Sequence, residues 1–204
     1  MRRRAIAILN AHPTLWALLS LPAAVASYRY VGGATSYGQF IHSSGDWAVW
    51  LLMATLAVTP LRLMFGSPGW TMWLMRRRRD LGVASFAYAA LHTLVYLERK
   101  AELGLIWTEA QDPGLATGWI AGFVFAALAI TSNDFSVRKL GPAWKRMHRL
   151  VYAGAILTFA HWLLTAFDPT MALIHVGVIA ALEIIRVVLS ARRKRARRAD
   201  TRAS

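Results

Sequence analysis

Six long apolar stretches follow one another along the chain, separated by short polar links. They cover residues 12–30, 45–65, 81–97, 115–132, 148–167 and 171–190. Each approaches the length of about 20 residues that a helix needs to cross a bilayer core. Apolar positions are nearly continuous within each stretch, unlike the one-sided pattern of a surface helix or the strict alternation of a barrel strand. The pattern predicts an all-α membrane protein, a bundle of six transmembrane helices.

Length and composition agree with this prediction. The six stretches in 204 residues leave no room for a separate soluble domain, so residues 1–204 are predicted to form one transmembrane domain. The chain is 56% hydrophobic and 17% charged, whereas an average soluble domain is about 25% charged. Cysteine is absent, which excludes disulfides, iron–sulfur clusters, thiolate metal sites and a cysteine nucleophile.

The positive charge is distributed unevenly, although its net value of +14 taken alone suggests nucleic acid. Of the 24 Lys and Arg residues, 20 lie at the two chain ends and in alternate links. They cluster at Arg2–Arg4, Arg62 with Arg76–Arg79, Arg138–Arg149, and in a basic tail at residues 191–204. The opposite links hold only Arg29, Arg99 and Lys100. The positive-inside rule therefore predicts that both termini and the basic tail are cytoplasmic, and nucleic acid becomes an unnecessary explanation.

The first stretch has an alternative interpretation. Arg2–Arg4, the apolar run and Ala24–Ala26 resemble a cleavable signal peptide. Cleavage after Ala26 leaves five helices with unchanged orientations. We expect the helix to be retained, because small residues are also common within membrane helices.

Two histidines lie deep within predicted membrane helices, where an ionisable side chain indicates function by default. With a rise of about 1.5 Å per residue, His92 lies about 20 Å beyond the inner basic residues and about 10 Å below the outer charges. The same count places His161 about 22 Å and about 10 Å from the two surfaces. The pair is thus predicted at one depth, where two imidazoles can hold a haem iron from both sides. The absence of cysteine leaves imidazole as the strong iron ligand.

His148 lies near the inner surface and has no counterpart at its level. The position expected for a partner falls at Arg78 and Arg79. His148 and His161 are 13 residues apart, so they point roughly 140° away from each other on an ideal helix. The other histidines are weaker candidates, of which the last is the strongest rival of the pair: His12, His42 and His175.

Small and aromatic residues indicate how the helices pack. Gly118 and Gly122 form a small-xxx-small pair that favours close approach of another helix. Five aromatic residues are assigned to packing, with contact to a cofactor as the alternative: Phe86, Tyr88, Tyr96, Trp144 and Tyr152.

Motifs in the third and fifth stretches resemble a known family. The third contains Arg78-Arg79-Asp80-Leu81-Gly82 and then Leu91-His92. Before and within the fifth stretch stand Arg138-Lys139-Leu140-Gly141, Trp144, His148 and His161. Together with Thr59-Pro60-Leu61, these motifs resemble the MsrQ (YedZ) family over about residues 40–190. That family is the haem-binding membrane subunit of the bacterial methionine sulfoxide reductase system MsrPQ, in the ferric-reductase-like transmembrane group.

The resemblance implies a multi-pass protein of the bacterial inner membrane that binds haem b and FMN. It implies His92 and His161 as axial ligands of the haem iron. For His148 it implies a possible second site, and three roles stay open: a weakly partnered second haem, a flavin or a quinone. Larger ferric reductases carry two histidines on the corresponding third helix, whereas this chain has one.

The resemblance also implies the direction of electron flow. Electrons from the quinone pool or a cytosolic flavin reductase would pass to a periplasmic molybdopterin subunit, MsrP. That subunit reduces methionine sulfoxide in oxidised periplasmic proteins. The chain itself would be an electron-transfer subunit of an oxidoreductase complex, without its own substrate site.

Two other functions are compatible with the sequence. One is a stand-alone membrane cytochrome b that reduces ferric iron or a quinone, and the other is a haem-free membrane scaffold. No strand–turn–helix glycine motif for a dinucleotide is present, so NAD(P)H is not expected to bind in the usual way. The inner basic residues suit an FMN phosphate or an acidic cytosolic donor. The acidic residues of the outer links suit a periplasmic partner: Glu98, Glu102, Glu109, Asp112 and Asp168.

Overall fold

The computed structural model describes residues 12–203, so the predicted cytoplasmic cluster Arg2–Arg4 lies outside the described residues. The long helices are α2 (His12–Val31), α3 (Tyr37–Phe65), α4 (Gly69–Lys100), α6 (Pro113–Ile130), α9 (Leu150–Thr165) and α10 (Thr170–Ala203). Three short helices lie in the links: α5 (Leu103–Glu109), α7 (Asp134–Leu140) and α8 (Pro142–Met147). Residues 12–203 contain no strand, which confirms the all-α class.

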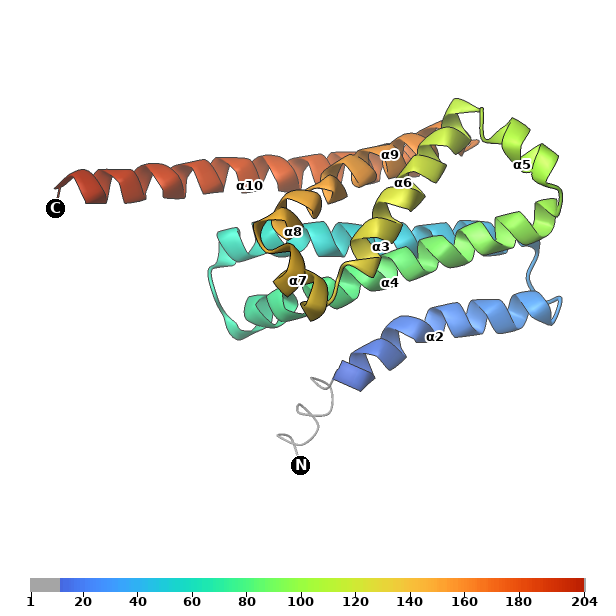
Figure 1. The fold of residues 1–204 in the computed structure, drawn as a ribbon, viewed down its shortest axis with the longest axis horizontal. Helices are drawn as coiled ribbons and strands as arrows, with labels where there is room; N and C mark the ends of the chain where they lie inside the picture. The colour runs from blue at the N-terminus through green and yellow to red at the C-terminus, as the bar shows by residue number, and fades with distance from the viewer. Residues whose placement is uncertain (1–11, 204) are drawn as a thin grey trace.

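The long helices lie side by side in a bundle (Figure 1). The hairpin of α3 and α4 packs along its length, α6 packs against α9, and α10 lies along α3 and α9. The α3–α4 link, α7 and α8 lie at one end, beyond which the last part of α10 projects. We call this the basic end, because it holds Arg76–Arg79, Arg138–Arg149 and residues 191–203. The α2–α3 link and α5 lie at the opposite end.

Capping residues determine where two of the long helices begin. The Ser36 hydroxyl accepts a hydrogen bond from the Gln39 amide at 3.3 Å, and the Gln39 side chain accepts one from the Ser36 amide at 3.0 Å. This capping box starts α3 at Tyr37, ahead of the apolar stretch that begins at residue 45. In α6, the Asp112 carboxylate caps the first turn, and Pro113 occupies the first helical position.

Two basic segments that the apolar pattern assigns to a link or a tail are helical. The pattern begins the third helix at Leu81, but α4 begins at Gly69 and includes Arg76–Arg79. The predicted tail from residue 191 continues α10 as a helix to Ala203. Arginine and lysine are good helix formers, so hydropathy alone underestimates a helix that extends beyond the bilayer.

Within residues 12–203, four helices are long and apolar enough to cross a membrane: α3, α4, α6 and the Thr170–Ala196 part of α10. The 16 residues of α9 rise about 24 Å, less than a hydrocarbon core of about 30 Å. The 20 residues of α2 are interrupted by Pro22 and do not reach the same apolarity. The structure thus supports four of the six predicted spans, while spans by α2 and α9 and the cytoplasmic side of the termini stay predictions.

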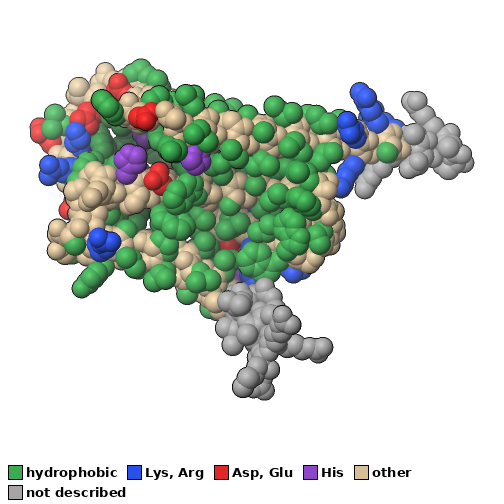
Figure 2. All heavy atoms as spheres, turned by 180° about the vertical axis from the view of Figure 1, so that it is seen from behind, with side chains coloured by type: hydrophobic (Ala, Val, Ile, Leu, Met, Phe, Trp, Pro, Cys, Tyr) green, Lys and Arg blue, Asp and Glu red, His purple; other side chains and the backbone are tan. Residues whose placement is uncertain are grey.

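The face of the bundle shown in Figure 2 is largely apolar between its two ends. On α10 alone, large apolar side chains face outward at Leu173, Ile174, Ile184 and Val187. Basic side chains of α10 project from one end, whereas acidic and histidine side chains gather at the other (Figure 2). Such an apolar band between polar ends is expected of helices surrounded by lipid.

Tyr88 joins α2 to α4 beside a proline. Pro22 has no amide hydrogen to donate, which weakens the helix around it. The Tyr88 hydroxyl donates to the Leu19 carbonyl at 2.8 Å and accepts from the Ala23 amide at 3.1 Å. One buried hydroxyl thus bonds two backbone groups of α2 that are one turn apart, and this contact fixes α2 against the bundle.

Candidate functional site

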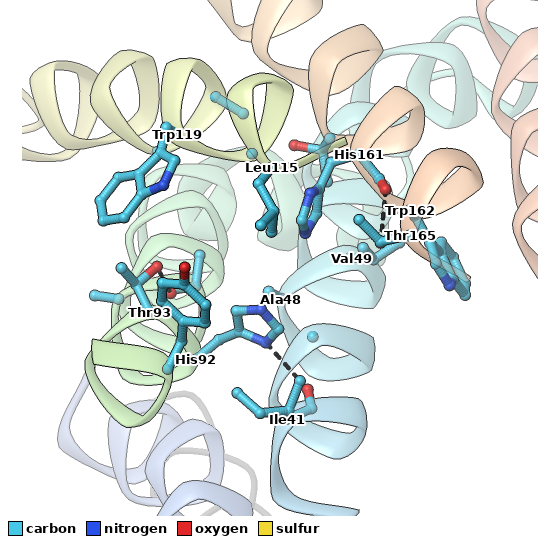
Figure 3. A pocket seen from close by; sticks show the side chains of 18 of the residues that line it. Ile41, Ala48, Val49, His92, Thr93, Leu115, Trp119, His161, Trp162 and Thr165 are labelled. Atoms are coloured by element: carbon cyan, nitrogen blue, oxygen red, sulfur yellow. Dashed lines mark hydrogen bonds between the residues drawn. The ribbon is translucent and has the colours of Figure 1, made fainter. Parts of the chain in front are cut away.

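A cavity of about 900 Å³ lies between α3, α4, α6 and α9. Cofactor sites typically measure about 300–1,000 Å³. His92 from α4 and His161 from α9 line the cavity, with ring centroids 6.4 Å apart and ring planes at 89°. The two imidazoles point toward one another across the cavity (Figure 3). The structure thus brings together the two histidines that the depth count places at one level.

The ring of His92 is oriented by α3. Its Nδ1 lies 3.0 Å from the backbone carbonyl of Ile41, and the Ser44 hydroxyl is 3.4 Å from the same nitrogen. A carbonyl only accepts, so Nδ1 carries the proton and donates to it. The ring also packs on α3 at Gly45, where a Cβ atom would make an ordinary contact of 3.5 Å with His92 Nδ1.

The ring of His161 is oriented by the first turns of α6. Its Nδ1 donates to the Gly114 carbonyl at 2.8 Å. Asp112 holds this turn by accepting from the Gly114 amide at 2.8 Å. Gly118, one turn further on, lies against the ring, and a Cβ atom there would be 2.7 Å from His161 Nδ1. Only glycine leaves space for the imidazole in this position.

This arrangement suits a metal ion between the two rings. Because both Nδ1 atoms donate to carbonyls, each Nε2 keeps its lone pair as a metal ligand. Two metal–imidazole bonds of about 2 Å separate the ring centroids by roughly 6 Å, close to the observed 6.4 Å. Histidines that ligate metals usually donate their other nitrogen to a carbonyl or carboxylate in this way. The pair therefore fits an iron held by two axial histidines.

His148 lies elsewhere, between α8 and α9 at the basic end. Its ring stacks on Trp144, with centroids 3.9 Å apart, and its Nε2 lies 3.2 Å from the Thr131 hydroxyl. Burial lowers the pKa of His148, and the charges of Arg79 and Arg78 lower this pKa further. Within residues 12–203, no second histidine faces His148, so its surroundings do not fit a second bis-histidine haem.

The remaining histidines do not join the central pair. His42 lines the cavity on α3, one turn from Asp46. His175 is outside the lining: its ring packs on Trp162 with centroids 5.2 Å apart, and its Nδ1 bonds to the Met171 carbonyl. The geometry thus favours His92 with His161 over a pairing that includes His175. The third, His12, lies 3.3 Å from the carboxylate of Asp80.

A polar cluster closes the cavity toward the opposite end. Lys100 of α4 donates to Glu109 of α5, and the Tyr96 hydroxyl donates to Glu109 Oε2 at 2.7 Å. These hydrogen bonds, first from Lys100 and then from Tyr96, lower the pKa of the Glu109 carboxyl. All three residues line the cavity, so the cluster belongs to the site as well as to the α4–α5 contact.

Comparison with known proteins identifies the family. Residues 44–159 match the family described as "Ferric reductase like transmembrane component". The chain is 37% identical over 189 residues to the protein-methionine-sulfoxide reductase heme-binding subunit MsrQ of Rhodospirillum rubrum, covering 89% of each chain. The MsrQ of Rhizobium meliloti is 34% identical over 187 residues, which is 85% of this chain and 84% of the relative. The chain belongs to the MsrQ family. The family resemblance carried by the motifs in the third and fifth stretches is thereby confirmed.

Within this MsrQ-family site, sequence reasoning missed the groups that orient the histidines. The carbonyls of Ile41 and Gly114 carry no sequence signal, because every residue has a carbonyl. The sequence pattern predicted Gly118 only as a small residue for helix packing, whereas in the structure it lies directly against the ring of His161. Of the aromatic residues assigned to packing, Phe86 and Tyr96 line the cavity.

Proposed function

We propose that this chain holds haem b between His92 and His161 and serves as an electron-transfer subunit of a methionine sulfoxide reductase system. The observation that carries the proposal is the 6.4 Å separation of two imidazoles whose Nδ1 atoms are both tied to backbone carbonyls. The relatives support the choice of cofactor, because their names describe a heme-binding subunit.

The residues of the chain would bind the haem, orient its two histidine ligands and keep water away from it. Ile41 and Gly114 fix one tautomer of each histidine, which leaves Nε2 as the ligand atom. Apolar side chains, such as Leu52 and Phe125, line the cavity toward the middle of the bundle and exclude water. A bound haem supplies reversible one-electron chemistry at its iron, at a potential that these surroundings tune.

The position of the histidine pair supports an electron acceptor on the periplasmic side. The histidine pair lies away from the basic end, which the positive-inside rule assigns to the cytoplasm. A carrier in this outer half is placed to reduce a periplasmic molybdopterin subunit of the MsrP type, which repairs oxidised periplasmic proteins. This chain, in the bacterial inner membrane, passes on electrons and does not itself bind methionine sulfoxide.

An inner carrier completes the path from the quinone pool or a cytosolic flavin reductase. The 13 residues from His148 to His161 correspond to about 20 Å along a helix. We propose that a flavin or a quinone binds near His148, since its ring already stacks on an aromatic face. The neighbouring Arg78 and Arg79 suit the phosphate of FMN.

A reduced-minus-oxidised spectrum of the purified protein tests the haem site. We expect a b-type α-band that His92→Ala and His161→Ala abolish. His175→Ala is the matched control, because it removes a histidine outside the cavity, and we expect it to keep the band. No band in the wild-type protein would favour a haem-free scaffold, whereas loss of the band only in His175→Ala would show the ligand pairing to be wrong.

A reoxidation experiment tests the partner. The protein is reduced in liposomes, and a purified periplasmic molybdopterin reductase is then added with methionine sulfoxide. We expect reoxidation that depends on both additions. Reoxidation by ferric iron alone, with none through the reductase, would indicate a stand-alone membrane reductase.

A further inference from the structure

The charged side chains that line the cavity gather toward one end, apart from Asp46 of α3. Toward the middle of the bundle its wall is apolar, formed by Leu52, Phe86 and Phe125. Toward the opposite end the wall contains Lys100, Tyr96 and Glu109. Lys100 is the only lysine or arginine that lines the cavity among the described residues. A ligand with an apolar body and acidic groups on one edge is therefore accepted in one orientation.

Lys100 lies on the same helix as His92 and slightly more than two turns beyond it. Eight residues separate the two, which corresponds to a rise of about 12 Å and a rotation of about 80°. Tyr96 lies between them, and all three side chains line the same cavity. The ammonium group thus lies on the α4 side of the cavity, as His92 does, and closer than the histidine pair to the end that holds α5.

The ammonium group of Lys100 already forms an ion pair with a carboxylate of the protein. Lys100 and the Tyr96 hydroxyl donate to the two different oxygens of the Glu109 carboxylate. An ammonium group has three N–H donors, so a lysine bonded to one carboxylate can bond to another. The side chains of Lys100 and Glu109 are 31% and 32% exposed, so both can be reached from the cavity.

We propose that Lys100 is a positioning residue that binds the propionate carboxylates of the haem and turns that edge toward α5. This inference rests on the proposed haem site, and it adds the orientation of the cofactor and the residue that sets it. The edge of the ring without carboxylates then faces the apolar wall, where none of the described lysine or arginine side chains lines the cavity to compensate a buried charge. Lys100 acts on the iron only through the haem edge, while His92 and His161 remain the ligands.

Lys100→Gln in the full-length holoprotein tests this assignment, with Lys100→Arg as the variant that restores the charge. Haem loss to excess apomyoglobin measures how firmly the cofactor is held. We expect loss to be roughly tenfold to a hundredfold faster in Lys100→Gln, as for removal of one charge-assisted hydrogen bond, and close to wild type in Lys100→Arg. Arg99→Gln removes a neighbouring charge that does not line the cavity, and we expect wild-type loss.

The propionate bending band in the resonance Raman spectrum reports the hydrogen bonding of the haem carboxylates directly. If Lys100 only stabilised the fold, its substitution would leave the frequency of this band unchanged. We expect Lys100→Gln to shift this band, while the low-spin spectrum of a bis-histidine haem persists. An unshifted band together with wild-type haem loss would overturn the role of Lys100 and leave the histidine site standing. Loss of the low-spin spectrum in His92→Ala remains the separate test of the proposed function.

Haem with esterified propionates makes the test independent of any variant. The full-length chain is produced without haem and loaded with haem or with its dimethyl ester. We expect the uncharged ester to dissociate from the wild-type protein faster by a similar factor. Equal dissociation of haem and ester would overturn the proposal.

Discussion

Substitution of Gly118 by alanine tests how tightly the structure defines the histidine site. A Cβ atom at this position would lie 2.7 Å from His161 Nδ1, where ordinary contact begins at 3.4 Å. The imidazole must therefore move by about 0.7 Å. Movement away from α6 lengthens its 2.8 Å hydrogen bond to the Gly114 carbonyl to as much as about 3.5 Å, beyond the range of about 2.7–3.2 Å for such bonds.

The expected effect follows from that displacement. Loss of a neutral hydrogen bond costs about 0.5–1.5 kcal/mol. Loss of the group that orients a metal-bound histidine typically lowers metal affinity by about 10- to 100-fold. We therefore expect Gly118→Ala to lower haem affinity at least tenfold, because the ring can no longer hold both its carbonyl and the iron.

The assay compares haem per protein and the rate of haem loss in wild-type protein and in two alanine variants. Gly177→Ala in α10 is the matched control, since a Cβ atom at that glycine meets nothing within 4 Å. We expect the control to bind haem as the wild type does. Wild-type haem content and haem loss in Gly118→Ala would show that the imidazole does not depend on the missing side chain at this position.

Three further predictions concern stability. Tyr88→Phe removes the hydroxyl that bonds the Leu19 carbonyl and the Ala23 amide of α2. It should lower stability by about 0.5–1.5 kcal/mol per hydrogen bond lost, seen as a lower unfolding midpoint in detergent at unchanged haem affinity; an unchanged midpoint would contradict it. Ser36→Ala removes the N-cap of α3 and should cost about 0.5–2 kcal/mol, measured in the same way against Ser136→Ala, whose hydroxyl caps no helix. Arg79 holds the pKa of Asp134 below its ordinary value of 3.8, chiefly through their hydrogen bond. The stability that Asp134 contributes is therefore present above pH 3.8 and is lost as the pH falls through the lower pKa of the folded state. In Asp134→Asn, the unfolding midpoint should fall less steeply with decreasing pH in this acidic range. Identical curves of midpoint against pH for the variant and the wild type would show that the Arg79–Asp134 pair does not contribute to stability.

The helices could be predicted from the sequence where the residues are apolar and lie within the membrane. Each of the six apolar stretches contains a helix, because a backbone in lipid must satisfy its hydrogen bonds within the segment. The extensions were not predictable from hydropathy. Residues 69–80 and 191–203 are helical although they are basic, and α3 starts early through the Ser36 capping box.

The depth of the two central histidines was also predictable. Helical rise converts position in the sequence into height, so His92 and His161 could be placed at one level before any contact was known. Height does not determine which way a side chain points. His175 is a rival by depth alone, and the packing of α10 places its ring against Trp162, outside the cavity lining.

The amino-acid pattern was enough to predict a membrane protein, the order of its helices, its basic end and the level of the histidine pair. These properties depend on residue type and on spacing along one helix. Three kinds of contact became known from the packing of the helices: the carbonyls of Ile41 and Gly114 accept hydrogen bonds from the imidazoles, Gly118 leaves space for His161, and Lys100 donates to Glu109. These contacts join residues of different helices, so they depend on the rotation and approach of helices, which hydropathy does not encode.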